Sequence, residues 1–140
     1  MKFSVKLKYG LQAVLELAQR YTSSAVQIKD IAKSQKIPIR YLEQLLLILK
    51  RRGVVKSTRG KQGGYALARH PSDITVLDVF EAYEGVLDLC VCNKKTQKDS
   101  VVCGVFRDIS DCMNKKLADI TIEDLVFKKK KNERAYIYNI

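Results

Sequence analysis

The chain has 140 residues, a length typical of one domain with a small appendage. Hydrophobic residues make up 46% of it, with only two prolines and seven glycines, which excludes wholesale disorder and collagen-like repeats. No apolar run approaches the roughly 20 residues of a membrane span, and no signal peptide is recognisable. We therefore expect a soluble, cytoplasmic protein with no membrane partner.

The formal charge of +11 is concentrated in the first half of the chain. Residues 1–70 hold fifteen Lys and Arg against three acidic residues, whereas residues 71–140 hold eleven against twelve. A basic half is typical of proteins that bind polyanions, because neutralising phosphates releases condensed counterions. The alternative is a surface that is basic only for solubility.

Three helices and a hairpin are expected in the basic half. Apolar residues recur at helical spacing over residues 4–19, 27–34 and 39–52. The last two of these helices are joined by a tight turn, which is the helix-turn-helix pattern. Residues 54–58 and 65–68 predict two strands around a basic, glycine-rich tip. The predicted fold is mainly α with a small β-hairpin, which makes a winged helix-turn-helix.

The second half predicts three more helices. Residues 74–84 form a helix with Thr75 as N-cap, and residues 102–120 form a long helix with one apolar stripe. Too little chain remains to cover that stripe, so we expect a dimerisation helix that packs against a second copy. The expected organisation is a DNA-binding domain and following helix (1–84), a cysteine-containing sensor loop (85–102), the dimerisation helix with a short capped helix (103–127) and a disordered basic tail (128–140).

All four cysteines lie within 23 residues of the second half: Cys90, Cys92, Cys103 and Cys112. In an intracellular chain such a group favours a metal or redox site over structural disulfides. Iron–sulfur, zinc and thiol/disulfide chemistry all suit thiolate ligands. Cys112 lies on the apolar stripe, and a buried core thiol is the alternative for it. The one histidine, His70, is expected to be structural.

An enzyme is not expected from this sequence. It has no Cys-x-x-Cys and no Ser-His-Asp or Cys-His arrangement. The glycines of residues 60–64 belong to a hairpin and not to a strand-to-helix phosphate loop.

Several motifs together resemble the Rrf-two family of bacterial transcription regulators, which contains the IscR, NsrR and CymR types. They are Ile39-Arg40-Tyr41-Leu42-Glu43-Gln44-Leu45, Ser57-Thr58-Arg59-Gly60, Gly63-Gly64-Tyr65-Ala66-Leu67, Ile74-Thr75-Val76-Leu77-Asp78-Val79 and Thr121-Ile122-Glu123-Asp124-Leu125. The resemblance covers residues 2–127. It implies a homodimeric winged-helix repressor or activator that binds double-stranded DNA.

The resemblance implies DNA contacts at the start of the recognition helix. Arg40, Tyr41 and Gln44 would contact bases and phosphates in the major groove. Glu43 lies where IscR-like members use an acid to discriminate DNA sites, since a carboxylate accepts from cytosine N4. The alternative for Glu43 is an exposed residue paired with Arg40 or Lys50.

At the wing, Arg59 matches the arginine expected in a narrow minor groove, where the negative potential is enhanced. Gly60 permits a close approach of the backbone. Lys61 completes the basic tip.

Cluster-binding members use three cysteines before the long helix and a fourth ligand that differs among members. Cys92 falls at the first position and Cys103 close to the third, whereas the middle position has no cysteine. The expectation is a 2Fe–2S cluster held by Cys92 and Cys103 with help from Cys90 or Cys112. The alternatives are thiol/disulfide sensing and a cluster-free regulator that responds to a protein partner, as CymR-like members do.

Overall fold

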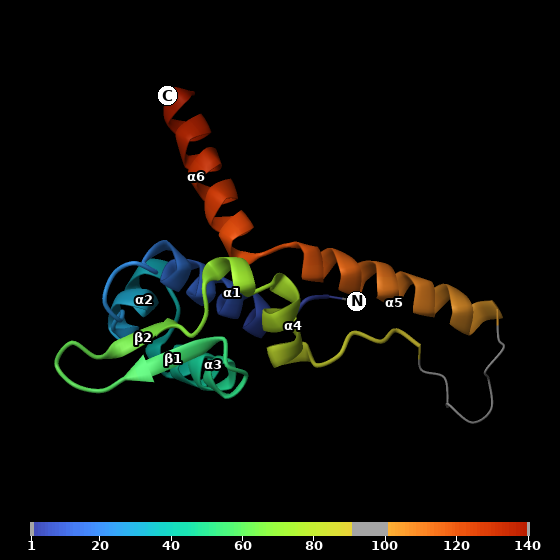
Figure 1. The fold of residues 1–140 in the computed structure, drawn as a ribbon, viewed down its shortest axis with the longest axis horizontal. Coiled ribbons are helices and arrows are strands. Elements are labelled where there is room, and N and C mark those ends of the chain that lie inside the picture. The colour runs from blue at the N-terminus through green and yellow to red at the C-terminus, as the bar shows by residue number, and fades with distance from the viewer. Residues whose placement is uncertain (1, 91–100, 140) are drawn as a thin grey trace.

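The computed structural model describes residues 2–90 and 101–139. The body contains α1 (Val5–Gln19), α2 (Ile28–Gln35), α3 (Ile39–Arg51), β1 (Val55–Thr58), β2 (Gly64–Leu67), the 3-10 turn η1 (Pro71–Asp73) and α4 (Val76–Glu84). Helices α5 (Val101–Asp119) and α6 (Ile122–Tyr138) follow, and they leave the body in different directions (Figure 1). This confirms the mainly helical winged-helix fold with one antiparallel hairpin.

One hydrophobic core joins α1, α2, α3, α4 and the hairpin. Three residues of the predicted α3 stripe, Leu42, Leu46 and Leu49, belong to this core. Leu45 is buried as well, and all four leucines are at most 1% exposed. Burying one leucine side chain contributes about 1.5–3 kcal/mol to folding. The stripe therefore fixes which face of α3 points outward.

A buried carboxylate ties α1 to the end of α2. Glu16 is 5% exposed, and its Oε2 accepts hydrogen bonds from Ser34 Oγ at 3.1 Å and Gln35 Nε2 at 2.8 Å. Its Oε1 forms an ion pair with Arg20 at 2.8 Å. A buried charge is tolerated when it is paired and hydrogen-bonded, and this one holds α2 in place just before the turn into α3.

Capping boxes begin α4 and α6. The Thr75 hydroxyl accepts from the Asp78 amide at 3.1 Å, and the Asp78 carboxylate accepts from the Thr75 amide at 2.9 Å. Thr121 and Asp124 repeat the arrangement. The backbone hydrogen bond from Thr121, and then its hydroxyl, hold the pKa of Asp124 below its usual value. An antiparallel bridge between Thr75 and Thr121 places the two caps side by side.

Helix α6 is longer than the sequence analysis predicted. The expectation of a helix ending at Phe127 and a disordered tail was wrong, because α6 continues to Tyr138. Residues 122–138 contain no Gly or Pro and are rich in strong helix formers. Lys129 Nζ also donates to Gln19 Oε1 of α1 at 3.0 Å. Among the described residues, no helix combines the length and apolarity needed to cross a membrane.

The extension of α6 can be tested with two variants of the exposed Lys131. Lys131→Gly and Lys131→Ala remove the same charge, but Gly costs a helix interior about 1 kcal/mol more than Ala. We expect amides of residues 128–138 to exchange with solvent about fivefold faster in the Gly variant. Equal exchange rates in the two variants would contradict a helix through this segment.

Candidate nucleic-acid interface

The outward face of α3 is polar. Because successive residues of a helix turn by about 100°, the buried leucine stripe leaves Arg40, Glu43 and Gln44 exposed. The helix begins after Pro38 without a side-chain cap. The unpaired amides of its first turn carry a partial positive charge, which favours anions.

Tyr41 is placed differently from the other predicted contact residues. It is half-buried against the core, and its ring meets that of Tyr9 edge-to-face with centroids 6.0 Å apart. Such pairs stabilise by about 0.5–1.5 kcal/mol beyond burial. The ring therefore anchors the first turn of α3 to α1.

Within the described part of the chain, Glu43 makes no ion pair. Lys50, one of its expected partners, instead donates to Ser57 Oγ of β1 at 2.6 Å. The carboxylate of Glu43 thus remains exposed to an external ligand.

The hairpin is attached to the body by an isolated antiparallel β-bridge. Strands β1 and β2 pair from Val55↔Leu67 to Thr58↔Gly64. Tyr65 of β2 also exchanges two backbone hydrogen bonds of 2.8 Å with Val26, which precedes α2. The wing is therefore fixed relative to the helix-turn-helix.

This attachment requires glycine at position 64. Gly64 has φ +152°, and a Cβ there would lie 2.3 Å from the carbonyl oxygen of Val26. At the tip, Gly60 has φ +112°, a conformation that L side chains rarely adopt. Arg59 and Lys61 on either side of it are exposed.

A polar depression of about 510 Å³ lies between the wing tip, the α1–α2 connection and the start of α2. Three cations and one acidic residue line it: Arg20, Lys29 and Lys61, with Asp30. Of these three cations, only Lys61 was expected from the sequence to contact DNA. Arg20 and Lys29 join it only because the wing lies close to the start of α2. The signal that pointed to them was the general basic excess of the first half.

Exposed cations extend from α3 to the wing tip. They are Arg40, Lys50, Arg51, Arg52, Lys56, Arg59 and Lys61, and Glu43 is the only acidic residue between positions 38 and 68. Figure 1 shows α3 and the hairpin on the side of the body away from α6. This surface has the charge of a polyanion-binding site.

The cysteines occupy distinct environments. Cys90 is a half-buried free thiol, Cys103 is 5% exposed and disulfide-bonded, and Cys112 is an exposed free thiol. The alternative of a buried core thiol does not hold for Cys112 among the described residues of one subunit, because they leave this side chain exposed. Cys92 lies outside the described residues, among which no group of three His, Cys, Asp or Glu could hold a metal.

The segment leading to Cys90 lies along one face of α5. Asn114 Nδ2 donates to the Leu87 carbonyl at 3.0 Å, and the Leu89 amide donates to Ser110 Oγ at 2.9 Å. Cys103, Ser110 and Asn114 share a helix face, since they are spaced by seven and four residues. The segment therefore runs from Asn114 toward the end of α5 that carries Cys103.

His70 is structural, as expected. Its Nδ1 accepts from the Ser72 amide at 3.1 Å and caps η1. Its ring meets Tyr21 edge-to-face with centroids 5.2 Å apart.

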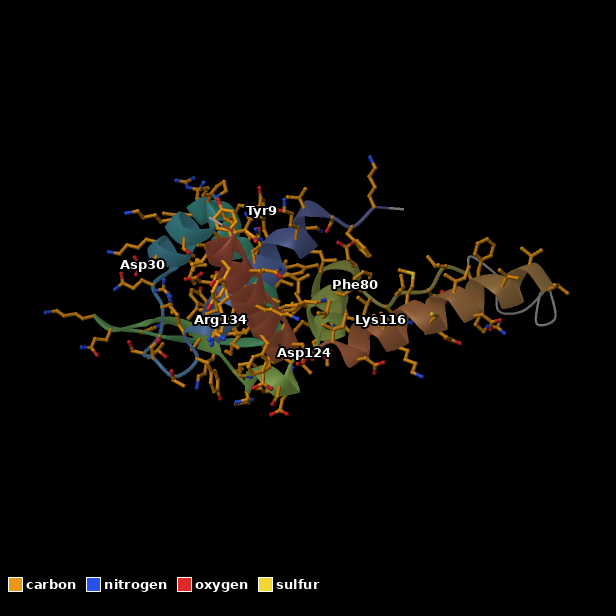
Figure 2. The ribbon with its side chains drawn as sticks, turned by 90° about the horizontal axis from the view of Figure 1, so that it is seen from above. Tyr9, Asp30, Phe80, Lys116, Asp124 and Arg134 are labelled. Carbon is orange, nitrogen blue, oxygen red and sulfur yellow. The ribbon has the colours of Figure 1, made fainter. Side chains whose placement is uncertain are left out.

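A second face of α5 is apolar and exposed. Val101, Val102, Val105, Phe106 and Ile109 are between 43% and 84% exposed. Figure 2 shows α5 extending away from the body beyond Lys116. Contiguous apolar surface of this kind marks an interaction site.

Several known proteins resemble this chain in sequence and in fold. Residues 3–128 match the Rrf2 family model, described as an iron-dependent transcriptional regulator. The HTH-type transcriptional regulator CymR of Bacillus subtilis (strain 168) is 32% identical over 140 residues, which is 100% of both chains. The structure of B. subtilis CymR superimposes with a TM-score of 0.80 at 32% identity, over 91% of this chain and 98% of that chain.

A second structure, IscR of T. potens, gives a TM-score of 0.78 at 38% identity, over 99% of this chain and 96% of that chain. The family model and both relatives agree with the resemblance seen in the motifs. The chain therefore belongs to the Rrf2 family of transcriptional regulators.

Proposed function

We propose that this chain regulates transcription by binding specific DNA sequences through α3 and the wing. The observation that carries the proposal is the exposed polar face of α3, which the buried leucine stripe turns outward. Helix α3 and the basic hairpin lie together on the side of the body away from α6 (Figure 1). A helix of this size fits the major groove, and a basic tip fits the adjacent minor groove.

The exposed residues of α3 and the wing suit separate contacts. Arg40 and Gln44 would contact base edges and phosphates, and Glu43 would accept from cytosine N4 while disfavouring phosphate. Arg59 would enter the minor groove, and Gly60 lets the backbone approach. Tyr41 contributes mainly by anchoring the helix.

The three cations of the polar depression would contact phosphates beside the wing. Arg20, Lys29 and Lys61 come from three segments that the Val26–Tyr65 pairing brings together. Contacts to phosphates fix the position of a protein on the duplex without selecting a sequence.

Arg59→Ala should weaken binding and lower the slope of log Kobs against log salt by about one. The measurement uses a duplex enriched from a random-sequence pool by the unmodified protein. Arg107→Ala, an exposed arginine of α5, serves as the control with the same loss of charge. If Arg59→Ala leaves affinity and slope unchanged, the wing does not contact DNA.

The protein would act as a homodimer through the exposed apolar face of α5. A second copy of the same chain is the expected occupant, because the described residues of one subunit leave the stripe exposed and an identical apolar helix could pack against it across a two-fold axis. A dimer would present two recognition helices to half-sites about one DNA turn apart.

Ile109→Glu introduces a charge into this face and should convert the dimer to a monomer in sedimentation velocity experiments. Asp111→Ala lies on the opposite face of α5 and should leave the dimer intact. A dimer that survives Ile109→Glu would place the interface elsewhere.

We further propose that the DNA affinity is controlled at Cys92 and Cys103, together with Cys90. The buried position of Cys103 and the direction of the segment after Leu87 support this choice. Cys112 is nine residues beyond Cys103 on one continuous helix, which separates them by about 13 Å along the axis. One small cluster in one subunit could not join both.

A 2Fe–2S cluster is the first candidate for this control. Three thiolates fit such a group and leave one position to another ligand, and the cluster when bound would supply a redox-active centre. A thiol/disulfide switch is the second candidate, and it is favoured by the disulfide at Cys103.

Anaerobic purification followed by iron and sulfide analysis distinguishes the candidates. With a cluster, visible charge-transfer absorption should be present in the unmodified protein and in Cys112→Ala, and lost in Cys92→Ala. A colourless, iron-free protein with full DNA affinity would reject the cluster. DNA binding that responds to diamide and dithiothreitol would then support the disulfide.

A further inference from the structure

Tyr83 of α4 makes a direct hydrogen bond to the recognition helix. Its hydroxyl donates to the carbonyl oxygen of Leu45 at 3.0 Å. Leu45 is 1% exposed and lies midway along α3, on the face opposite the DNA-facing residues. A backbone carbonyl can accept this bond in addition to its helical one, because it has two lone pairs.

The ring of Tyr83 occupies space that only glycine leaves free. A Cβ at Gly10 of α1 would lie 2.1 Å from Tyr83 Cε2 and 2.7 Å from its hydroxyl oxygen. Gly10 therefore allows the ring of Tyr83 to extend from α4 past the backbone of α1 and to reach α3. This requirement explains a buried glycine within a helix, where glycine costs about 1 kcal/mol.

The hydroxyl is a neutral donor over the whole physiological range. Burial raises its pKa well above the usual value, and the nearby Tyr41 raises it further. Tyr41 also belongs to α3 and is itself anchored by Tyr9. The hydroxyl is therefore protonated and able to donate this hydrogen bond at neutral pH.

Helix α4 is also the element that leads into the cysteine segment. It ends at Glu84 with Gly85 as its C-cap. The next residues are held on α5 through the backbone of Leu87 and Leu89, immediately before Cys90. Contacts also join α4 directly to α5. A displacement of the cysteine segment relative to α5 would therefore act on α4 and, through its tyrosine, on α3.

We propose that Tyr83 is a positioning residue, which fixes α3 against α4 and transmits the state of the cysteine segment to the DNA-binding face. This inference rests on the proposed function. It assigns to Gly10 the role of admitting the tyrosine.

The first test compares Tyr83→Phe with Tyr136→Phe, an exposed tyrosine of α6. Each variant loses only a hydroxyl group. On the duplex selected by the unmodified protein, Tyr83→Phe should bind about fivefold to tenfold more weakly, whereas Tyr136→Phe should bind normally. Normal binding by Tyr83→Phe would overturn the positioning role.

A second measurement distinguishes a residue that transmits the redox state of the cysteines from one whose loss only weakens DNA binding. The ratio of DNA affinities between the dithiothreitol-reduced and diamide-treated protein should fall toward one in Tyr83→Phe. A residue that only stabilises the fold would lower both affinities equally and leave the ratio unchanged. An unchanged ratio would overturn the transmission.

The pairing with Gly10 is tested by a double-mutant cycle. Gly10→Ala alone should displace the ring and weaken DNA binding at least as much as Tyr83→Phe. In Tyr83→Val no ring lies against position 10, so adding Gly10→Ala should lower the DNA affinity little further. Additive losses in the double variant would contradict the pairing.

A test without DNA separates this inference from the proposed function. If no duplex is enriched from the random pool, the proposed function fails. Amide hydrogen exchange would still report the contact, and amides of residues 46–50 should exchange about fivefold faster in Tyr83→Phe than in Tyr136→Phe. Equal exchange would show that the hydroxyl does not hold α3.

Discussion

The burial of one leucine stripe on α3 is the constraint on which the rest of the molecule depends. Leu42, Leu45, Leu46 and Leu49 have almost no exposed surface, so rotating the helix would expose apolar area and bury charges. The outward direction of Arg40, Glu43 and Gln44 follows from this packing. This outward orientation requires no unusual backbone geometry. It requires only that the helix cannot rotate about its own axis.

Polar and aromatic contacts from other elements also fix the position of α3. Glu16 holds the end of α2, Tyr9 meets Tyr41 in the first turn, and Tyr83 reaches the carbonyl of Leu45. The wing is fixed separately through Val26 and Tyr65. The surface proposed to bind DNA is thus assembled from α3 and the hairpin, while α4 connects it to the residues before Cys90 and to α5.

Much of the fold could be predicted because the relevant signals are local. Leucines at helical spacing, the caps at Thr75 and Thr121 and the glycines around the wing tip each specify short-range geometry. The family resemblance followed from the same motifs. The end of α6 was missed because a run of lysines is compatible with both a solvated tail and a helix, and the contact of Lys129 with Gln19 is not local.

The features that could not be predicted from the sequence depend on contacts between residues that are far apart in the chain. The depression that joins Arg20 and Lys29 to Lys61 exists only because Tyr65 pairs with Val26. The partnership of Gly10 with Tyr83 links positions 73 residues apart. Likewise, the proposal that Cys112 and Cys103 do not share one cluster depends on α5 being one continuous helix.

Two basic surfaces of this molecule are candidates for DNA binding: the face of α3 with the wing, and the lysine-rich part of α6, which lies on the other side of the body (Figure 1). A nuclear magnetic resonance titration with the selected duplex decides between them directly. If α3 and the wing bind the duplex, the largest amide shift changes should occur at Arg40, Glu43, Gln44 and Arg59, and residues 128–138 should be little affected. The largest changes at residues 128–138, with α3 unaffected, would contradict this mode of binding.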